Sequence, residues 1–311
     1  MSVRKIIFST LNLFDHHKEK MPNLFNQVFK KDLQISNKNK DRVRVCVNEI
    51  IRYRGIIDYL IEKGSKRKIN YLNPKIRNVL RIGIYELIFD DIVPDFAAIH
   101  ANVELAKTNI NRKSSSMVNA VMRNIQRYSK KNKNWKISLV QDKIQLAYPN
   151  WLIKKWEKDF GTDLTKSLCN EFLKKKNMHI RLDINLLSVD EMIYMLKQDN
   201  IDVVQHKHFK LFFEVILGQK NVLNNDLFKN GIISIQDPAS GAVVEIIDPQ
   251  ENDSILDVCA APGTKSLFMA QKVGKGGKIF ACDISQKRID KALNDKLRHK
   301  LNNIHWHLLD A

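Results

Sequence analysis

The chain has 311 residues, 52 Lys and Arg against 34 Asp and Glu, and a formal net charge of +18. No run approaches the roughly 18 consecutive apolar residues of a membrane-spanning helix, and the N-terminus lacks the apolar core of a signal peptide. Four cysteines without C-x-x-C spacing predict neither a disulfide framework nor a zinc site. We therefore expect a cytoplasmic, metal-free protein of two or three domains.

The positive charge is unevenly distributed. Residues 1–130 contain 25 Lys and Arg against 12 Asp and Glu, residues 131–230 contain 17 against 12, and residues 231–311 contain 10 against 10. Lysines often only solvate helix faces, and a compositional bias towards lysine would produce many of them. Such a bias would affect all three segments alike, whereas the last is neutral. The asymmetry favours an RNA partner for the first segment.

Residues 1–130 are predicted to form an all-α domain. Asn73-Pro74 is typical of a helix start, and apolar residues follow it at helical spacing, namely Ile76, Val79, Leu80, Ile84 and Leu87. Phe96–Lys107 and Ser116–Tyr128 have the same periodicity, and glycine and proline are scarce. Within the second of these helices, we expect His100 to be a packing residue rather than a ligand.

Residues 131–230 are predicted to contain a linker and a small α+β module. Lys130–Trp135 is polar and charged, as linkers are. Ser188–Gln198 reads as a helix with a capping box, between strands predicted at Met178–Leu182, Ile201–Val204 and Phe212–Leu217. Before them, four residues fall on one helix face: Trp151, Leu152, Trp156 and Phe160. We expect that face to pack into a core, although exposed tryptophans could instead stack on bases.

Residues 231–311 predict the start of a parallel α/β sheet. Ile255, Leu256 and Val258 indicate a buried strand, Ala260 to Gly263 a tight turn, and Lys265–Val273 a helix. Further strands are expected at Lys278–Asp283 and at Ile304–Leu309, each ending next to an acid. A strand, a turn of small residues and a helix present backbone N–H groups to a ligand. The glycine spacing is not G-x-G-x-x-G and no P-loop is present, which weakens the alternative of a nucleotide-dependent oxidoreductase.

Ile255–Leu267 closely resembles the S-adenosylmethionine loop of the RNA 5-methylcytosine methyltransferases, and Ser234–Gly241 is similar to the segment that precedes it in that family. In the first segment, Arg81–Leu87, His100–Lys107 and Met117–Asn124 resemble the NusB-like RNA-binding domain. The two resemblances together match the domain layout of the bacterial 16S rRNA cytosine-5 methyltransferase B group (Sun/RsmB). The chain is identified as a member of that group.

The resemblance implies a multi-domain fold: a NusB-like all-α domain (1–130), a linker and small α+β module that helps to hold RNA (131–230), and the front half of a Rossmann-type class I methyltransferase domain (231–311). It implies S-adenosylmethionine as cofactor and 16S rRNA as partner of a monomeric protein. Asp283 would accept hydrogen bonds from the ribose and Asp310 would lie near the adenine, although either acid alone would ordinarily be a helix cap. The loop residues expected at the cofactor are Cys259, Ala260, Ala261, Pro262, Gly263, Thr264 and Lys265.

The resemblance also implies which chemistry is missing. Enzymes of this class add a cysteine thiolate to carbon 6 of cytosine, which activates carbon 5 for attack on the methyl sulfonium. Their two cysteines follow the third strand in Pro-Cys and Thr-Cys contexts, and this chain has neither dipeptide. We therefore expect no catalytic residue within the chain, a nucleophile beyond Ala311, and Cys259 and Cys282 as buried packing residues. A non-catalytic RNA-binding protein remains the alternative.

The same family places its strands in the order 3-2-1-4-5-7-6, so its first strand is central. In residues 1–311, which reach only the third strand, Ile255–Cys259 would then be an open apolar edge. Native proteins generally protect such edges because they recruit other chains. The sequence is therefore expected to be a fragment or a truncated gene product rather than a complete enzyme.

Overall fold

The computed structural model describes residues 2–16, 19–32, 34–130, 139, 141–174, 176–183 and 185–310. It divides into two compact units, Met1–Lys175 and Lys176–Ala311, which are described separately. Beyond Lys130, the predicted linker falls outside the described residues. No described helix has the length and hydropathy needed to cross a membrane.

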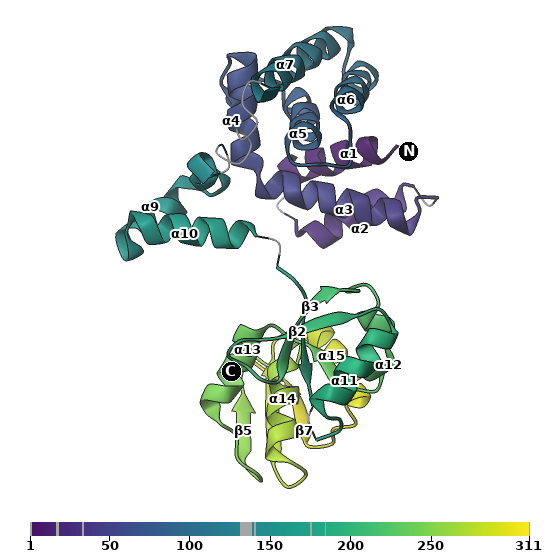
Figure 1. Ribbon diagram of the computed structural model, residues 1–311, viewed down its shortest axis with the longest axis vertical. Helices are drawn as coiled ribbons and strands as arrows, with labels where there is room; N and C mark the ends of the chain where they lie inside the picture. Colours follow the sequence, from purple (N-terminus) through teal and green to yellow (C-terminus); the bar gives the residue numbers. More distant parts are fainter. Residues whose placement is uncertain are drawn as a thin grey trace. The chain divides into compact units, whose positions relative to one another are not determined.

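The first unit is helical, as predicted (Figure 1). Its central helix is α5 (Pro74–Ile88), in which every residue from Asn78 to Ile88 is buried. A helix that is buried on all sides must be surrounded by others, because no face is left for water. The remaining helices are α1 (Val3–His16), α2 (Met21–Lys30), α3 (Asn37–Arg52), α4 (Arg54–Ser65), η1 (Ile69–Tyr71), α6 (Asp95–Asn109), α7 (Arg112–Lys130), η2 (Ile144–Ala147), α9 (Asn150–Phe160) and α10 (Thr162–Leu173).

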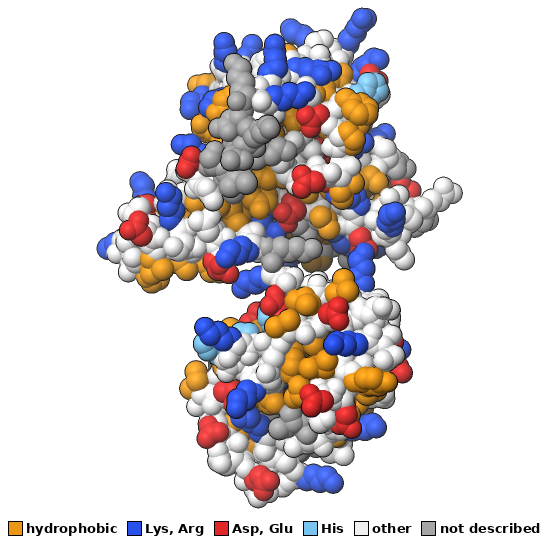
Figure 2. Space-filling model, viewed as in Figure 1, with side chains coloured by type: hydrophobic (Ala, Val, Ile, Leu, Met, Phe, Trp, Pro, Cys, Tyr) orange, Lys and Arg blue, Asp and Glu red, His pale blue; other side chains and the backbone are white. Residues whose placement is uncertain are grey.

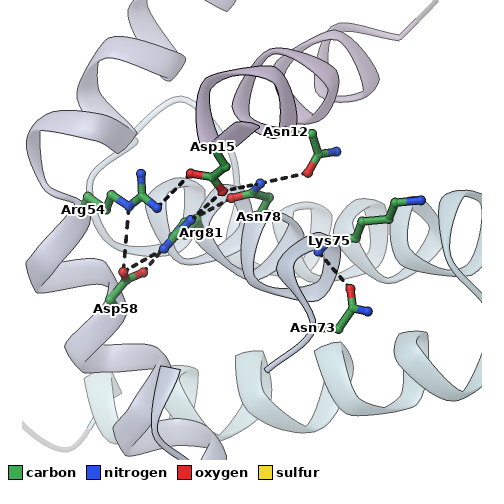
Figure 3. Close-up of polar contacts among 8 residues, drawn as sticks. All are labelled: Asn12, Asp15, Arg54, Asp58, Asn73, Lys75, Asn78 and Arg81. Carbon is green, nitrogen blue, oxygen red and sulfur yellow. Dashed lines mark hydrogen bonds and ion pairs between the residues drawn. The ribbon is translucent and has the colours of Figure 1, made fainter. Parts of the chain in front are cut away.

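The predicted start of α5 is confirmed. Asn73 is the N-cap, its side-chain oxygen accepting a hydrogen bond from the Lys75 N–H at 2.9 Å, and Pro74 is the first helical residue. Further along α5, the Arg81 guanidinium is 3% exposed and donates to both Asp58 oxygens at 2.8 Å (Figure 3). Asp15 also accepts from Arg81, at 3.3 Å. This buried cluster ties α1, α4 and α5 together at one point.

Two expectations about packing in this unit are wrong. Trp151 and Phe160 are 67% and 51% exposed, so the aromatic face of α9 is only partly a core face. Trp156 does pack, against Tyr148 and against Phe172, with ring centroids 5.7 and 5.8 Å away. His100 is exposed on α6 rather than packed. Helical spacing identified the face that these residues share, but it could not show whether another element covers it.

The second unit begins with a four-stranded antiparallel sheet in the order β2-β3-β1-β4. The predicted capping box of α11 is present, because the Ser188 side chain accepts from the Glu191 N–H and Glu191 accepts from the Ser188 N–H. Ile233–Ile235 forms β4 and pairs with β1, so the module includes residues from the third predicted segment. The elements are β1 (His179–Leu182), α11 (Val189–Gln198), β2 (Asp202–Gln205), β3 (Phe212–Leu217), η3 (Val222–Asn224), α12 (Asp226–Lys229) and β4 (Ile233–Ile235).

A three-stranded parallel sheet follows, in the order β5-β6-β7, as predicted. Its helices are α13 (Pro238–Ile247), α14 (Thr264–Val273) and α15 (Gln286–Arg298), and its strands are β5 (Ser254–Asp257), β6 (Lys278–Asp283) and β7 (Ile304–Leu308). Among the described residues β5 pairs only with β6, and Leu256 is 63% exposed. The expected open edge is therefore observed within the described part of the chain.

A buried arginine joins the antiparallel sheet of this unit to α14. Arg181 on β1 is 2% exposed, and it donates to the Gln236 side-chain oxygen at 2.8 Å and to that of Gln271 at 2.6 Å. Its guanidinium carbon lies 4.1 Å from the centroid of the Phe268 ring. Burial lowers the pKa of Arg181 to about 10. Because Phe268 and Gln271 belong to α14, this contact fixes the helix that follows the predicted cofactor loop.

Candidate cofactor site

The predicted loop connects β5 to α14 and folds tightly against its own sheet. Ala260 and Ala261 are 2% exposed, and the Gly263 N–H donates to the Ala260 carbonyl oxygen at 2.8 Å. The Ala261–Pro262 peptide bond is cis. Small side chains in this loop allow the chain to turn back towards the sheet, and the loop's backbone remains close to the surface because Pro262 is exposed.

Glycine is required at position 263. Its φ is +106°, a backbone conformation that residues with a side chain rarely adopt. A Cβ at this position would lie 3.1 Å from the Ala292 Cβ and 3.2 Å from the Trp306 ring. The indole N–H of Trp306 is buried without a hydrogen-bond partner among the described residues. The loop therefore lies directly against α15 and β7.

Asp283 is held beside the loop. Its side chain is 3% exposed and accepts hydrogen bonds from the Ala261 N–H at 3.2 Å and from the Ser285 N–H at 3.0 Å. Arg288 forms an ion pair with it at 3.1 Å and also donates to the Ala261 carbonyl oxygen. The acid at the end of β6 thus stabilises the loop after β5, which brings the two predicted parts of the site together.

Two residues of this site were not predicted. Asp257 at the end of β5 is 8% exposed, and its carboxylate accepts from the Ser266 hydroxyl at 2.8 Å and from the Cys259 N–H at 3.3 Å. The signal was present, since an acid ends β5 just as one ends β6. Arg288 gave no signal, because its contact with the Ala261 carbonyl oxygen depends on how α15 packs.

The remaining predicted site residues lie in different surroundings. Thr264 and Lys265 are half-buried at the start of α14. Asp310 is exposed, two residues after Leu308, which is paired with Asp283 in the sheet register. Asp310 is therefore near the same strand ends, but no contact joins it to the loop in the described structure. Cys259 is exposed, so the expectation that it is a buried packing residue is wrong.

The remaining cysteines are poorly suited to nucleophilic chemistry. Cys46, Cys169 and Cys282 are buried. Burial raises the pKa of Cys46 to about 12, and burial also raises the pKa of Cys169. A thiol with a raised pKa has little of the thiolate form that attacks carbon. Within the described ranges, no three His, Cys, Asp or Glu side chains are placed to share a metal ion.

Three family profiles match consecutive parts of the chain: the NusB family at residues 1–127, a ferredoxin-like domain of the RsmF/B-like methyltransferases at 148–211, and the 16S rRNA methyltransferase RsmB/F family at 244–311. The structure described as that of PH0851 has a TM-score of 0.65 at 20% identity, covering all of this chain and 70% of its own. The class is thus a multi-domain protein with a NusB-like helical domain, a ferredoxin-like module and a class I methyltransferase fold.

Sequence comparison with curated relatives indicates the particular family. The probable ribosomal RNA small subunit methyltransferase B of Synechocystis sp. is 31% identical over 261 residues, covering 82% of this chain and 57% of the relative. The protein of the same name in Bacillus subtilis is 26% identical over 317 residues, covering 100% and 69%. Together these matches support an RsmB/Sun-type 16S rRNA methyltransferase as the family of this chain. It spans 57% and 69% of the length of these two relatives.

Proposed function

We propose that this chain supplies the RNA-binding and cofactor-binding parts of an enzyme that methylates carbon 5 of a cytosine in 16S rRNA. The observation that carries the proposal is the contact between Asp283 and the Ala261 N–H, because it joins the two predicted halves of a cofactor site. Family membership supports rRNA as the substrate. We further propose a cytoplasmic monomer that needs no metal.

The residues around the loop fit S-adenosylmethionine. A nucleoside needs an acceptor for its ribose beside a loop of small residues, and Asp283 lies beside such a loop, in contact with the Ala261 N–H. We propose that Asp283 holds the ribose, that residues 259–265 approach the methionine part, and that Asp310 lies near the adenine. When bound, S-adenosylmethionine would supply an electrophilic methyl group. The protein's part is to fix that group's position, which the buried contacts of Asp257 and Arg181 support.

RNA binding by the helical unit should depend steeply on salt. Several phosphate contacts release counterions, and each adds about 0.7–0.9 to the slope of log affinity against log salt. We expect the 311-residue chain to lose orders of magnitude in affinity for a 16S rRNA fragment over a few-fold rise in salt. Fluorescence anisotropy at four salt concentrations measures this. A flat dependence would show that the excess charge of residues 1–130 does not contact phosphates.

Residues 1–311 on their own are expected not to transfer methyl to RNA. Without a thiolate at carbon 6, carbon 5 stays unactivated. Three of the four cysteines are buried, and the exposed one, Cys259, belongs to the loop proposed to hold the cofactor. The test incubates the chain with 16S rRNA and methyl-labelled S-adenosylmethionine and then analyses nucleosides. Label in 5-methylcytidine that survives replacement of all four cysteines would contradict the mechanism. Label that disappears on replacing Cys259 or Cys282 alone would identify the nucleophile.

A non-catalytic RNA-binding protein is the second candidate. The observation in its favour is α7, which has five Lys and Arg and no Asp or Glu over its 19 residues. RNA binding without S-adenosylmethionine binding would select this candidate, whereas binding of both would select the first.

A further inference from the structure

A concavity of about 470 Å³ lies between the last turn of α4 and the first half of α7. Its apolar wall includes Met117 and Val121, and its polar rim includes Asn111, Asn124, Arg67 and Lys113. This volume is in the range of about 300–1,000 Å³ typical of small-ligand sites. The whole concavity belongs to the helical unit, and it is separate from the cofactor loop in sequence and in fold.

The charge around this concavity is mostly positive. Residues 62–68 include four Lys and Arg and one acid, Glu62, which pairs with Lys68 at 3.3 Å, and α7 adds five Lys and Arg without an acid. The described residues that line the concavity include Arg67 and Lys113 and no acid, and Lys and Arg side chains are numerous over this end of the unit (Figure 2). A concave surface of one sign concentrates an oppositely charged ligand. The ligand is therefore expected to be anionic.

The rim also offers hydrogen-bond donors in fixed positions. The Asn124 amide nitrogen donates to the Gly64 carbonyl oxygen at 2.9 Å, and its oxygen accepts from Arg127 at 2.6 Å. Both contacts hold the Asn124 side chain and leave its second N–H for a ligand. The Asn111 oxygen caps α7 by accepting from the Ser114 N–H at 2.8 Å, which leaves the Asn111 amide N–H groups available to a ligand.

An apolar wall, amide donors and flanking cations are together the chemistry that recognises a nucleotide. A base can lie against apolar side chains or an arginine plane and accept hydrogen bonds on its edge, while cations contact its phosphate. We propose that this concavity binds one unstacked nucleotide of single-stranded RNA, with Met117 and Val121 beneath the base and with Arg67 and Lys113 on the phosphate. This inference rests on the RNA binding proposed above and locates it.

The test fills the concavity without changing the charge. Ala120 lines it, whereas the neighbouring Asn119 is exposed and does not, so Ala120→Phe and Asn119→Phe are matched variants of the full chain. The probes are ten-nucleotide single-stranded oligoribonucleotides and an abasic strand of the same length. Ala120→Phe should weaken binding of the base-containing strands about tenfold and leave the abasic strand unchanged. Asn119→Phe should change neither, and Lys113→Ala should weaken both alike.

Other outcomes separate this proposal from RNA binding in general. If the wild-type chain binds the abasic strand as tightly as the others, RNA binding stands and the nucleotide site is wrong. If Ala120→Phe and the smaller Ala120→Leu, with unchanged far-UV circular dichroism, have no selective effect, the site is likewise wrong. If the wild-type chain binds no strand, both proposals fail. An oligoglutamate peptide whose binding is lost in Ala120→Phe, while RNA binding persists, would assign the concavity to a protein partner.

Discussion

Replacing Arg81 with alanine is expected to lower the free energy of unfolding of the helical unit by about 3–5 kcal/mol. The guanidinium is 3% exposed and bonds both oxygens of Asp58, together with Asp15 and Asn78 (Figure 3). Removing it leaves Asp58 with the longer, 4.0 Å contact to Arg54, whereas Asp15 keeps its 2.8 Å pair with Arg54. The loss should exceed the value of one ion pair, because a partly buried carboxylate that loses its main cation is costly.

Arg44→Ala is the matched control. Arg44 pairs with Asp41 at 3.0 Å, but both side chains are about half exposed, so its loss should cost less than about 1 kcal/mol. Urea unfolding followed by circular dichroism measures both variants, and hydrogen exchange of the α5 amides assigns the transition to the helical unit. Equal losses for Arg81→Ala and Arg44→Ala would mean that the cluster is not a source of stability.

The dependence of stability on pH provides a second test of the same cluster. Burial alone would raise the pKa of Asp15, but the charge of Arg54, the hydrogen bond from Asn78 and the charge of Arg81 together hold that pKa below its ordinary value. A carboxyl with a lowered folded-state pKa contributes stability that is complete above its unfolded pKa, about 3.9, and is lost as pH falls through the folded value. The wild-type unit should therefore lose stability below about pH 4, and Arg81→Ala should lose less of it.

The sequence predicted the parallel sheet almost residue for residue because its signals are local. Lys278–Asp283 was expected as a strand and is β6, and a strand, a turn and a helix lie around Gly263 as predicted. The expectation that the strand before Gly263 is buried is wrong, because Leu256 is 63% exposed and Val258, which follows β5, is 48% exposed. Apolar runs, small residues and a proline determine such a unit within about twenty residues of chain. Asp283 could be placed for the same reason, since the ends of neighbouring parallel strands meet at one edge of the sheet.

The features that could not be predicted from the sequence depend on packing between residues that are distant along the chain. Arg288 donates to the Ala261 carbonyl oxygen only because α15 packs beside the loop, and Trp306 contacts Gly263 only because β7 pairs with β6. Helical spacing likewise placed Trp151 on an apolar face but could not show that this residue is exposed. The concavity beside α7 is a further case, because its wall joins two helices that are far apart in sequence.

Asp283→Ala is expected to weaken S-adenosylmethionine binding by about 1.5–3 kcal/mol, the range for charge-assisted hydrogen bonds. Calorimetry of the 311-residue chain measures the affinity. Asp290→Ala is the control, because Asp290 is an exposed acid on α15 and its removal changes the net charge equally. Asp290→Ala should leave the affinity unchanged. If the wild-type chain gives no binding heat, the cofactor proposal itself is contradicted.

Asp283→Asn separates direct from indirect effects. The carboxylate now accepts from the Ala261 and Ser285 N–H groups and pairs with Arg288, so alanine removes support for the loop as well as a ribose acceptor. Asparagine keeps one acceptor oxygen and the side-chain volume but loses the charge. Asparagine also gives up one of the two backbone contacts and the ion pair, so some loss of thermal stability is expected. If Asp283 holds the ribose as a carboxylate, Asp283→Asn should lose affinity well beyond what its fall in thermal stability accounts for. If affinity instead falls in proportion to stability, Asp283 supports the loop and does not contact the ribose.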